Sequence, residues 1–169
     1  MKDDVAAEAH RCLTEAGIDF VACMPDSAFL ELYQRLEADS GVRYLQVANE
    51  SDGVGVCMGA WLGGARPAML MENTGFALSC YALLRGPAAF GVPMLLLISY
   101  RGGFGDQRWF SVPFGWATEP LLRSLRIHYS VVNESGDMAH AIAGAVNSMN
   151  AMQAPVAVLF PPKLFSDTT

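Results

Sequence analysis

Apolar and polar positions along the chain alternate between two patterns. Short runs rich in Val, Leu, Ile and Met are typical of β-strands, whereas longer segments with apolar positions three or four residues apart are typical of amphipathic helices. The short runs predict strands at residues 19–24, 42–47, 67–72, 92–99, 127–132 and 155–160. The longer segments predict helices at residues 4–16, 27–38, 51–64, 77–89, 117–125 and 137–151.

Strands that alternate with helices in this order predict an α/β fold. We expect a doubly wound, mainly parallel six-stranded sheet with helices on both faces. The nearly continuous apolar run at 92–99 is typical of a strand covered on both sides. A chain of 169 residues suits one domain with a substantial core, so we predict a single domain over residues 1–169.

Composition narrows the class of protein. Hydrophobic residues make up 52% of the chain and charged residues 17%, which favours much buried surface, a subunit interface included. A net charge of -6 without a cluster of Lys and Arg argues against nucleic acid or an anionic membrane surface as partner. The four cysteines lack metal-site spacing, the N-terminus lacks the pattern of a signal peptide, and the longest apolar run is too short to span a bilayer. We therefore expect a cytoplasmic protein with reduced thiols and no metal ligands of its own.

Candidate chemistry gathers where the predicted strands end. In doubly wound sheets, ligands bind beyond the carboxyl ends of the strands. Four segments leave strands there: MPDS at 24–27, ANES at 48–51, ENTG at 72–75 and SYRGG at 99–103. The last segment opens into a loop rich in Gly and aromatic residues at 100–115, and a loop of that length is usually functional.

The stretch DGVGVCMGA is close to the glycine fingerprint of a dinucleotide-binding turn. The spacing departs from G-x-G-x-x-G, and the glycines fall inside a predicted helix instead of the turn before it. Glycine inside a helix costs about 1 kcal/mol relative to alanine, so the repeat needs another reason. Gly55, Gly59 and Gly63 form one smooth stripe, which suits tight packing within the monomer, a subunit interface or a cofactor wall.

Five motifs, in order along nearly the whole chain, resemble the pyrimidine-binding (Pyr) domain of thiamine diphosphate-dependent decarboxylases. A strand ends at Glu50, a helix of small residues follows, and Gly59 and Gly64 lie nine and fourteen residues after the glutamate, before a strand that begins at Pro67. MPDS resembles a V-P-D-S turn and ENTG resembles a Q-N-S-G turn. PMLLLISYRG and FGWATEPLLRSLRIHY resemble the later part of the domain. Within the family, the similarity is greatest to enzymes of the sulfopyruvate and phosphonopyruvate decarboxylase type.

The resemblance implies half of a split enzyme. Members of the family need a second, diphosphate-binding (PP) domain, which carries a G-D-G motif and holds Mg²⁺ and the diphosphate. The chain contains no G-D-G, so the resemblance implies a separate PP-domain β-subunit, thiamine diphosphate bound between the chains, and an α2β2 or higher hetero-oligomer. The implied substrate is a small 2-oxo acid.

The resemblance also assigns cofactor-binding roles. The family's glutamate binds the aminopyrimidine ring of the cofactor and activates it, a role that falls to Glu50. Asn73, Thr74 and Gly75 lie on the next strand-to-helix turn and are expected to bind the same ring. Outside the family context, Glu50 also suits the first turn of a helix, and the residues at 73–75 suit a helix cap.

Further residues are expected to bind the substrate or to transfer a proton to it. Asp26 and Ser27 would face the reacting carbon and relay the proton that replaces CO2, although they also suit an N-cap. Arg101, on the long loop, would hold a carboxylate, sulfonate or phosphonate through its guanidinium, and Gln107 is a second candidate there.

One departure from the family leaves the substrate open. Relatives tend to read N-S-G-L-G-N where this chain reads NTGFAL, which makes the wall more apolar. Besides a decarboxylase subunit, the sequence therefore suits a thiamine diphosphate-dependent carboligase subunit that forms C–C bonds. A non-catalytic partner that stabilises a catalytic chain is a third alternative.

Overall fold

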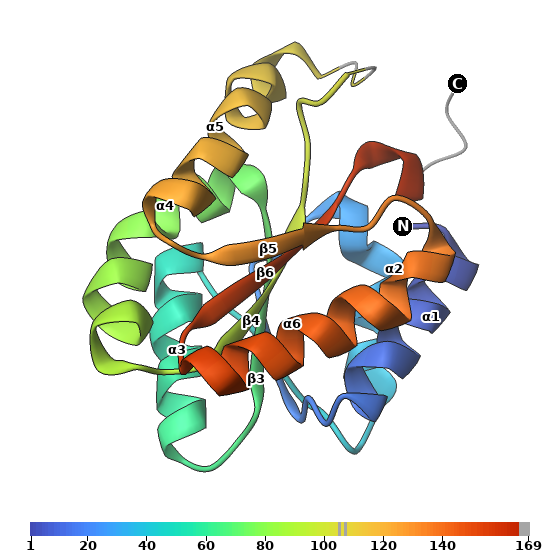
Figure 1. Ribbon diagram of the computed structural model, residues 1–169. Coiled ribbons are helices and arrows are strands. Elements are labelled where there is room, and N and C mark those ends of the chain that lie inside the picture. The colour runs from blue at the N-terminus through green and yellow to red at the C-terminus, as the bar shows by residue number, and fades with distance from the viewer. Residues whose placement is uncertain (105, 107, 166–169) are drawn as a thin grey trace.

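The computed structural model describes residues 1–104, 106 and 108–165, which form one six-stranded sheet flanked by helices (Figure 1). Every pair of neighbouring strands is parallel, and the strand order is β2-β1-β3-β4-β6-β5. The strands are β1 (Phe20–Cys23), β2 (Arg43–Gln46), β3 (Pro67–Glu72), β4 (Met94–Ser99), β5 (His128–Val131) and β6 (Pro155–Phe160). The predicted doubly wound sheet is confirmed, and it is wholly parallel.

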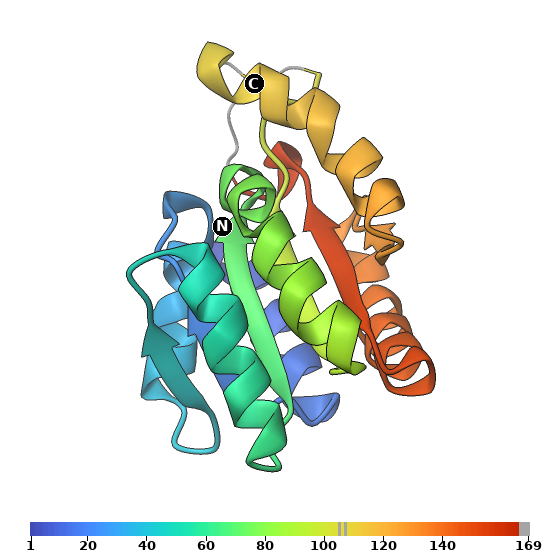
Figure 2. The same cartoon turned by 90° about the vertical axis from the view of Figure 1, so that its left-hand side faces the viewer.

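Three helices cover each face of the sheet. One layer contains α1 (Asp3–Glu15), α2 (Leu30–Ala38) and α6 (Met138–Met152); the other contains α3 (Glu50–Leu62), α4 (Asn73–Leu83) and α5 (Val112–Ser124). Figure 2 shows the second layer from outside. Short helical turns complete the order at Ser27–Phe29 (η1), Leu84–Ala88 (η2), Trp109–Ser111 (η3), Ser135–Asp137 (η4) and Pro162–Leu164 (η5).

The central strands explain why their sequences are apolar throughout. Side chains alternate between the two faces of a strand, so along β4 Leu95 and Leu97 join the core under α1, α2 and α6, while Leu96 and Ile98 join the core under α3, α4 and α5. All six residues of β4 are buried, whereas the edge strands β2 and β5 are exposed at several positions. In the described part of the chain, no helix is both long and apolar enough to cross a membrane.

Two helices begin earlier than predicted. The long loop was expected to run to residue 115, but η3 and α5 make it helical from Trp109 onward. Pro113 lies in the first turn of α5, where a missing N–H costs no hydrogen bond, so a residue that suggests a loop instead starts the helix. Helix α4 likewise begins at Asn73 instead of residue 77, directly after β3.

The glycine repeat lies inside α3 and is exposed. A Cβ added to Gly55 or Gly59 would meet no atom within 4 Å, so tight packing of these two glycines within the monomer is wrong. The stretch is not a phosphate-binding turn either, because Asn49 caps the helix before the glycines begin. The stripe therefore presents bare backbone to the outside of the α3–α4 layer.

Candidate active site

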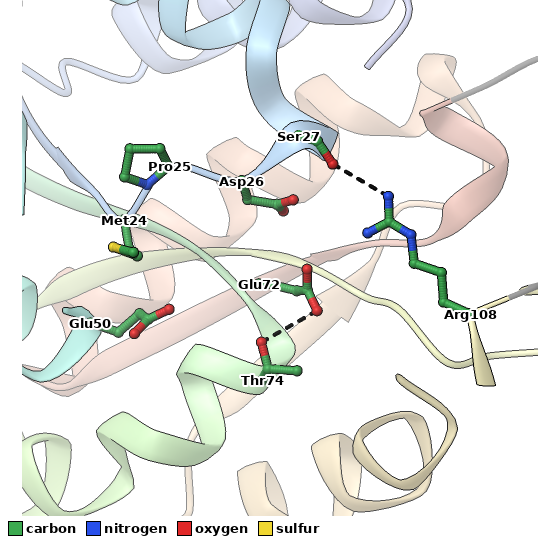
Figure 3. Close-up of a pocket in the computed structure, with 8 residues that line it drawn as sticks. All are labelled: Met24, Pro25, Asp26, Ser27, Glu50, Glu72, Thr74 and Arg108. Carbon is green, nitrogen blue, oxygen red and sulfur yellow. Dashed lines mark hydrogen bonds between the residues drawn. The ribbon is translucent and has the colours of Figure 1, made fainter. Parts of the chain in front are cut away.

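A pocket of about 290 Å³ opens at the carboxyl edge of the sheet, between β1 and β3. After β1 the chain continues into α2 on one face, and after β3 it continues into α4 on the other, so this is the point at which a doubly wound sheet leaves a crevice. The residues that line the pocket are Met24, Pro25, Asp26, Ser27, Glu50, Glu72, Thr74 and Arg108 (Figure 3).

Asp26 is held by two hydrogen bonds on the turn after β1. One carboxylate oxygen accepts from the Ala28 N–H at 2.9 Å, which starts η1, and the other accepts from the Ser99 hydroxyl at 2.5 Å. Because Ser99 ends β4, which lies beyond β3 as seen from β1, the Asp26 carboxylate reaches across the end of β3. The neighbouring Ser27 hydroxyl accepts from the Arg108 guanidinium at 3.4 Å.

Glu50 is the first residue of α3 and points into the pocket (Figure 3). The side chain of Asn49 accepts from the Asp52 N–H at 3.0 Å, which fixes where the helix starts. The Glu50 carboxyl packs against Gly75 of α4 so closely that a Cβ at position 75 would overlap with it. Within the part of the chain that is described, this carboxyl has no hydrogen-bond partner, so it is free to bind a ligand.

Glu72 is a pocket residue that sequence reasoning missed. It ends β3, opposite Ser99 in the register of β3 with β4, and its carboxyl accepts from the Thr74 hydroxyl at 3.3 Å. Burial raises the pKa of Glu72, and the charge of Asp26 raises it further, while the Thr74 hydroxyl and the charges of Arg108 and Arg101 act in the opposite direction. The available signal was its place at the end of a central strand, beside the turn that carries Asp26.

Asn73 and Arg101 lie outside the pocket lining. The Asn73 amide group donates to the Arg101 carbonyl at 2.9 Å and to the Thr118 hydroxyl at 3.0 Å, and its oxygen accepts from the Arg101 N–H at 3.3 Å. The Arg101 guanidinium pairs with Asp106 at 2.9 Å, with both side chains largely buried. Arg108, from the same loop, lines the pocket in its place, and Gln107 lies outside the described residues.

The pocket thus combines four of the expected site residues with two additional charged groups. Asp26, Ser27, Glu50 and Thr74 come together on one crevice, and Gly75 supports Glu50 from behind. Carboxyl groups on a partly buried surface can exchange protons with a bound molecule and can accept hydrogen bonds from it. No group of three or more His, Cys, Asp or Glu residues suited to holding a metal ion occurs within the described ranges.

The fold is shared with a class of enzymes that use thiamine diphosphate. The chain superposes on a thiamine diphosphate-dependent 4-hydroxybenzoylformate decarboxylase from Rhodococcus jostii with a TM-score of 0.74 at 15% identity, over 96% of this chain and 31% of that one. The chain therefore has the fold found in part of a thiamine diphosphate-dependent enzyme. No family model matches it.

Sequence comparison gives the family. Over 155 residues the chain is 31% identical to the sulfopyruvate decarboxylase subunit alpha of Methanococcus maripaludis, covering 91% of this chain and 93% of that one. It is 29% identical to the phosphonopyruvate decarboxylase of Streptomyces viridochromogenes, but covers only 41% of that longer protein. The chain belongs to the family of sulfopyruvate decarboxylase alpha subunits, which confirms the resemblance seen in the sequence.

Proposed function

We propose that the chain is the Pyr-type subunit of a thiamine diphosphate-dependent 2-oxo acid decarboxylase. The observation that supports this most directly is the unpartnered Glu50 carboxyl, which points into the pocket at the switch point of the sheet. In a chain of this family, a free carboxyl at that position is suited to bind the aminopyrimidine of the cofactor.

The pocket fits one part of the cofactor. A flat ring that carries hydrogen-bonding nitrogens needs a free carboxyl to bind it, and Glu50, packed against Gly75, presents one on the pocket lining. Thiamine diphosphate, when bound, would accept the electron pair released as CO2 leaves the substrate. We assign the diphosphate and Mg²⁺ to a partner subunit.

Residues on the turn after β1 would supply the proton that replaces CO2 on the substrate. Loss of CO2 breaks a C–C bond, and a proton must take the place of CO2 on the substrate carbon. Asp26 lies on the pocket, fixed by Ser99 and Ala28, so its carboxyl is oriented without help from the substrate. We assign proton transfer to Asp26 and a hydrogen bond to the reacting group to Ser27.

The outer surface of the α3–α4 layer suggests where the partner would bind. Apolar side chains project there without cover, Tyr81 with 76% and Leu62 with 68% of their area exposed. Other exposed apolar side chains of this layer are Leu78, Leu84 and Phe90. Gly55 and Gly59 leave open backbone on the same layer, so another helix could approach closely. We call these side chains and glycines the α3–α4 surface and propose that the PP-domain subunit covers it in an α2β2 or higher assembly.

The names of the relatives support the split arrangement and suggest the substrate. The chain covers nearly all of a relative named as an alpha subunit, and less than half of a longer decarboxylase. We therefore propose a single Pyr-type domain that works with a separate chain on a 2-oxo acid, the class to which the sulfopyruvate and phosphonopyruvate of the relatives' names belong. The four cysteines are free, which suits a reducing compartment such as the cytoplasm.

A co-expression experiment tests the proposal. The chain would be produced together with a PP-type subunit from the same organism, and release of CO2 from 2-oxo acids would be measured with and without thiamine diphosphate. We expect activity that depends on the cofactor and falls by about a thousandfold in Glu50→Gln, because the variant loses the titratable group that faces the ring. Glu37→Gln, which changes the same charge on the exposed side of α2, should leave activity unchanged.

Two outcomes would overturn the proposal. If Glu50→Gln turns over normally, the assignment of Glu50 is wrong and the chain serves as a stabilising partner. If CO2 release is always coupled to a ligated product, the chain belongs to a carboligase.

A further inference from the structure

The pocket lining has an uneven charge. Three carboxyl groups line it, those of Asp26, Glu50 and Glu72, against the single guanidinium of Arg108. The other nearby cation, Arg101, is paired with Asp106 and lies off the lining. This chain therefore offers one positive group to a substrate in that pocket.

The three carboxyl groups differ in the hydrogen bonds that they accept and in the roles already assigned to them. Asp26 already accepts two hydrogen bonds, and Glu50 is assigned to the cofactor under the proposed function. Glu72 accepts only the hydroxyl of Thr74 and faces the pocket between Asp26 and Thr74 (Figure 3). Glu72 is therefore the carboxyl left to interact with the substrate.

The electrostatic surroundings of Glu72 are set by four charged residues on three elements. Asp26 faces it from the turn after β1, Glu50 from α3, and Arg101 and Arg108 from the loop after β4. A 2-oxo acid brings one carboxylate, which the Arg108 guanidinium can pair with through two parallel hydrogen bonds. A second acidic group on the same substrate would meet Glu72 with no cation of this chain left to balance it.

We propose that Glu72 is a specificity-determining residue that disfavours substrates with a second acidic group and selects 2-oxo acids with an uncharged side chain. The inference rests on the proposed function and narrows its class of 2-oxo acids to those that lack the second acidic group of sulfopyruvate and phosphonopyruvate. Like charges brought together in a partly buried site repel strongly, so one carboxyl can separate two otherwise similar substrates.

The test compares two substrates on the co-expressed complex. 2-Oxobutanoate has an uncharged side chain, and sulfopyruvate carries a sulfonate whose charge stays constant across the pH range of the assay. We expect Glu72→Gln to raise kcat/KM for sulfopyruvate by about tenfold or more while that for 2-oxobutanoate changes by less than about threefold. Gln keeps the size of the side chain and can still accept from Thr74, and Glu37→Gln provides the matched loss of charge away from the pocket.

The pH profile separates charge from shape. In the wild type, discrimination against sulfopyruvate should grow as pH rises through the pKa of Glu72, because only the ionised carboxyl repels the sulfonate. In Glu72→Gln the ratio of the two kcat/KM values should be flat with pH. A binding measurement gives an independent readout: by calorimetry on the complex, Glu72→Gln should tighten 3-sulfopropanoate and leave butanoate unchanged.

Failure of this inference can be told from failure of the proposed function. An unchanged substrate ratio in Glu72→Gln, with normal turnover that depends on thiamine diphosphate, would overturn the role of Glu72 alone. A wild-type complex with no such turnover of any 2-oxo acid would overturn the function, and equal binding of 3-sulfopropanoate by wild type and variant would then overturn the inference as well.

Discussion

Glu50 and Gly75 form the contact on which the proposed site depends most closely. The sequence suggested that Gly75 makes room for the pyrimidine ring, and that contact stays a prediction. What the structure adds is that Gly75 makes room for the Glu50 carboxyl itself, because any side chain at position 75 would overlap with it. A glycine on α4 thereby sets the direction of a glutamate on α3.

Gly75→Ala should disable the site without unfolding the protein. The added methyl group would push the Glu50 carboxyl away, and a displacement of about 1 Å in a catalytic group can lower turnover by about a hundredfold. The measurement is CO2 release by the co-expressed complex, with circular dichroism to check the fold.

Gly144→Ala is the matched control for that experiment. It makes the same change in α6, where an added Cβ meets nothing within 4 Å. We expect normal turnover and a slightly higher Tm, because alanine is favoured over glycine in a helix by about 1 kcal/mol. Equal activity of both variants would contradict the proposed role of the Glu50 contact.

Glu72 should make the stability of the protein depend on pH. Its pKa is raised in the folded state, so the folded protein holds the proton at pH values where the unfolded chain has lost it. The contribution of Glu72 to the free energy of unfolding is fully present below the pKa of the residue in the unfolded chain, near 4.3. It is lost as pH rises through the higher pKa of the residue in the folded protein. Glu72→Gln should therefore stabilise the protein most above the folded pKa and least near pH 4. Urea unfolding at several pH values measures this, and a gain that grows toward acid pH would contradict it.

Individual site residues were predictable to the extent that they follow strand ends. Asp26, Ser27, Glu50 and Thr74 were all identified that way, and the structure gathers them in one pocket. Glu72 opens the ENTG segment that follows the third predicted strand, but the resemblance assigned roles only to the three residues after it. The choice between Arg101 and Arg108 depended on the ion pair with Asp106, which no spacing along the chain reveals.

At the scale of elements, strands were easier to predict than helix starts. The strand at 155–160 agrees with the structure at both ends, because a run of consecutive apolar residues marks a strand buried on both faces. The starts of α4 and α5 were missed because both begin with residues that also favour turns, Asn73 at α4 and Pro113 at α5. The start of α4 depends on the tertiary hydrogen bonds of Asn73, and the start of α5 depends on the position of η3 directly before it.

Asn73 links three elements, so its loss should loosen them together. Its side chain bonds to the backbone of Arg101, after β4, and to Thr118 on α5. In Asn73→Ala these buried groups lose their partner, which should lower the free energy of unfolding by about 1 to 3 kcal/mol. Urea unfolding gives the magnitude, and faster amide exchange at Arg101 would locate the effect.

An exposed asparagine controls for the change in side chain. Asn150→Ala on α6 should change the free energy of unfolding by less than about 0.5 kcal/mol. If the two variants are equally stable, the Asn73 bonds do not hold the elements together.

At the scale of the whole molecule, the pocket and the α3–α4 surface lie on connected parts of the fold. The first residues of α3 and α4 border the pocket, and the outer sides of the same helices carry the exposed apolar residues. A partner that covers these helices would thus lie next to the pocket into which the Glu50 carboxyl points. In the proposed assembly, this partner would cover the exposed glycines and apolar residues on the outside of the layer.

Tyr81→Glu should therefore prevent assembly while the chain remains folded. A carboxylate in the middle of a desolvated apolar contact would lose its hydration without gaining a partner, which should weaken binding of the PP-type subunit by at least about tenfold. Met152→Glu is the control, because Met152 is a partly exposed apolar residue at the end of α6, in the layer on the opposite face of the sheet. Light scattering on the purified mixtures measures assembly, and addition of excess partner should restore CO2 release in Tyr81→Glu, because the pocket itself is intact. Unchanged assembly of Tyr81→Glu, or equal loss in both variants, would place the partner on another face.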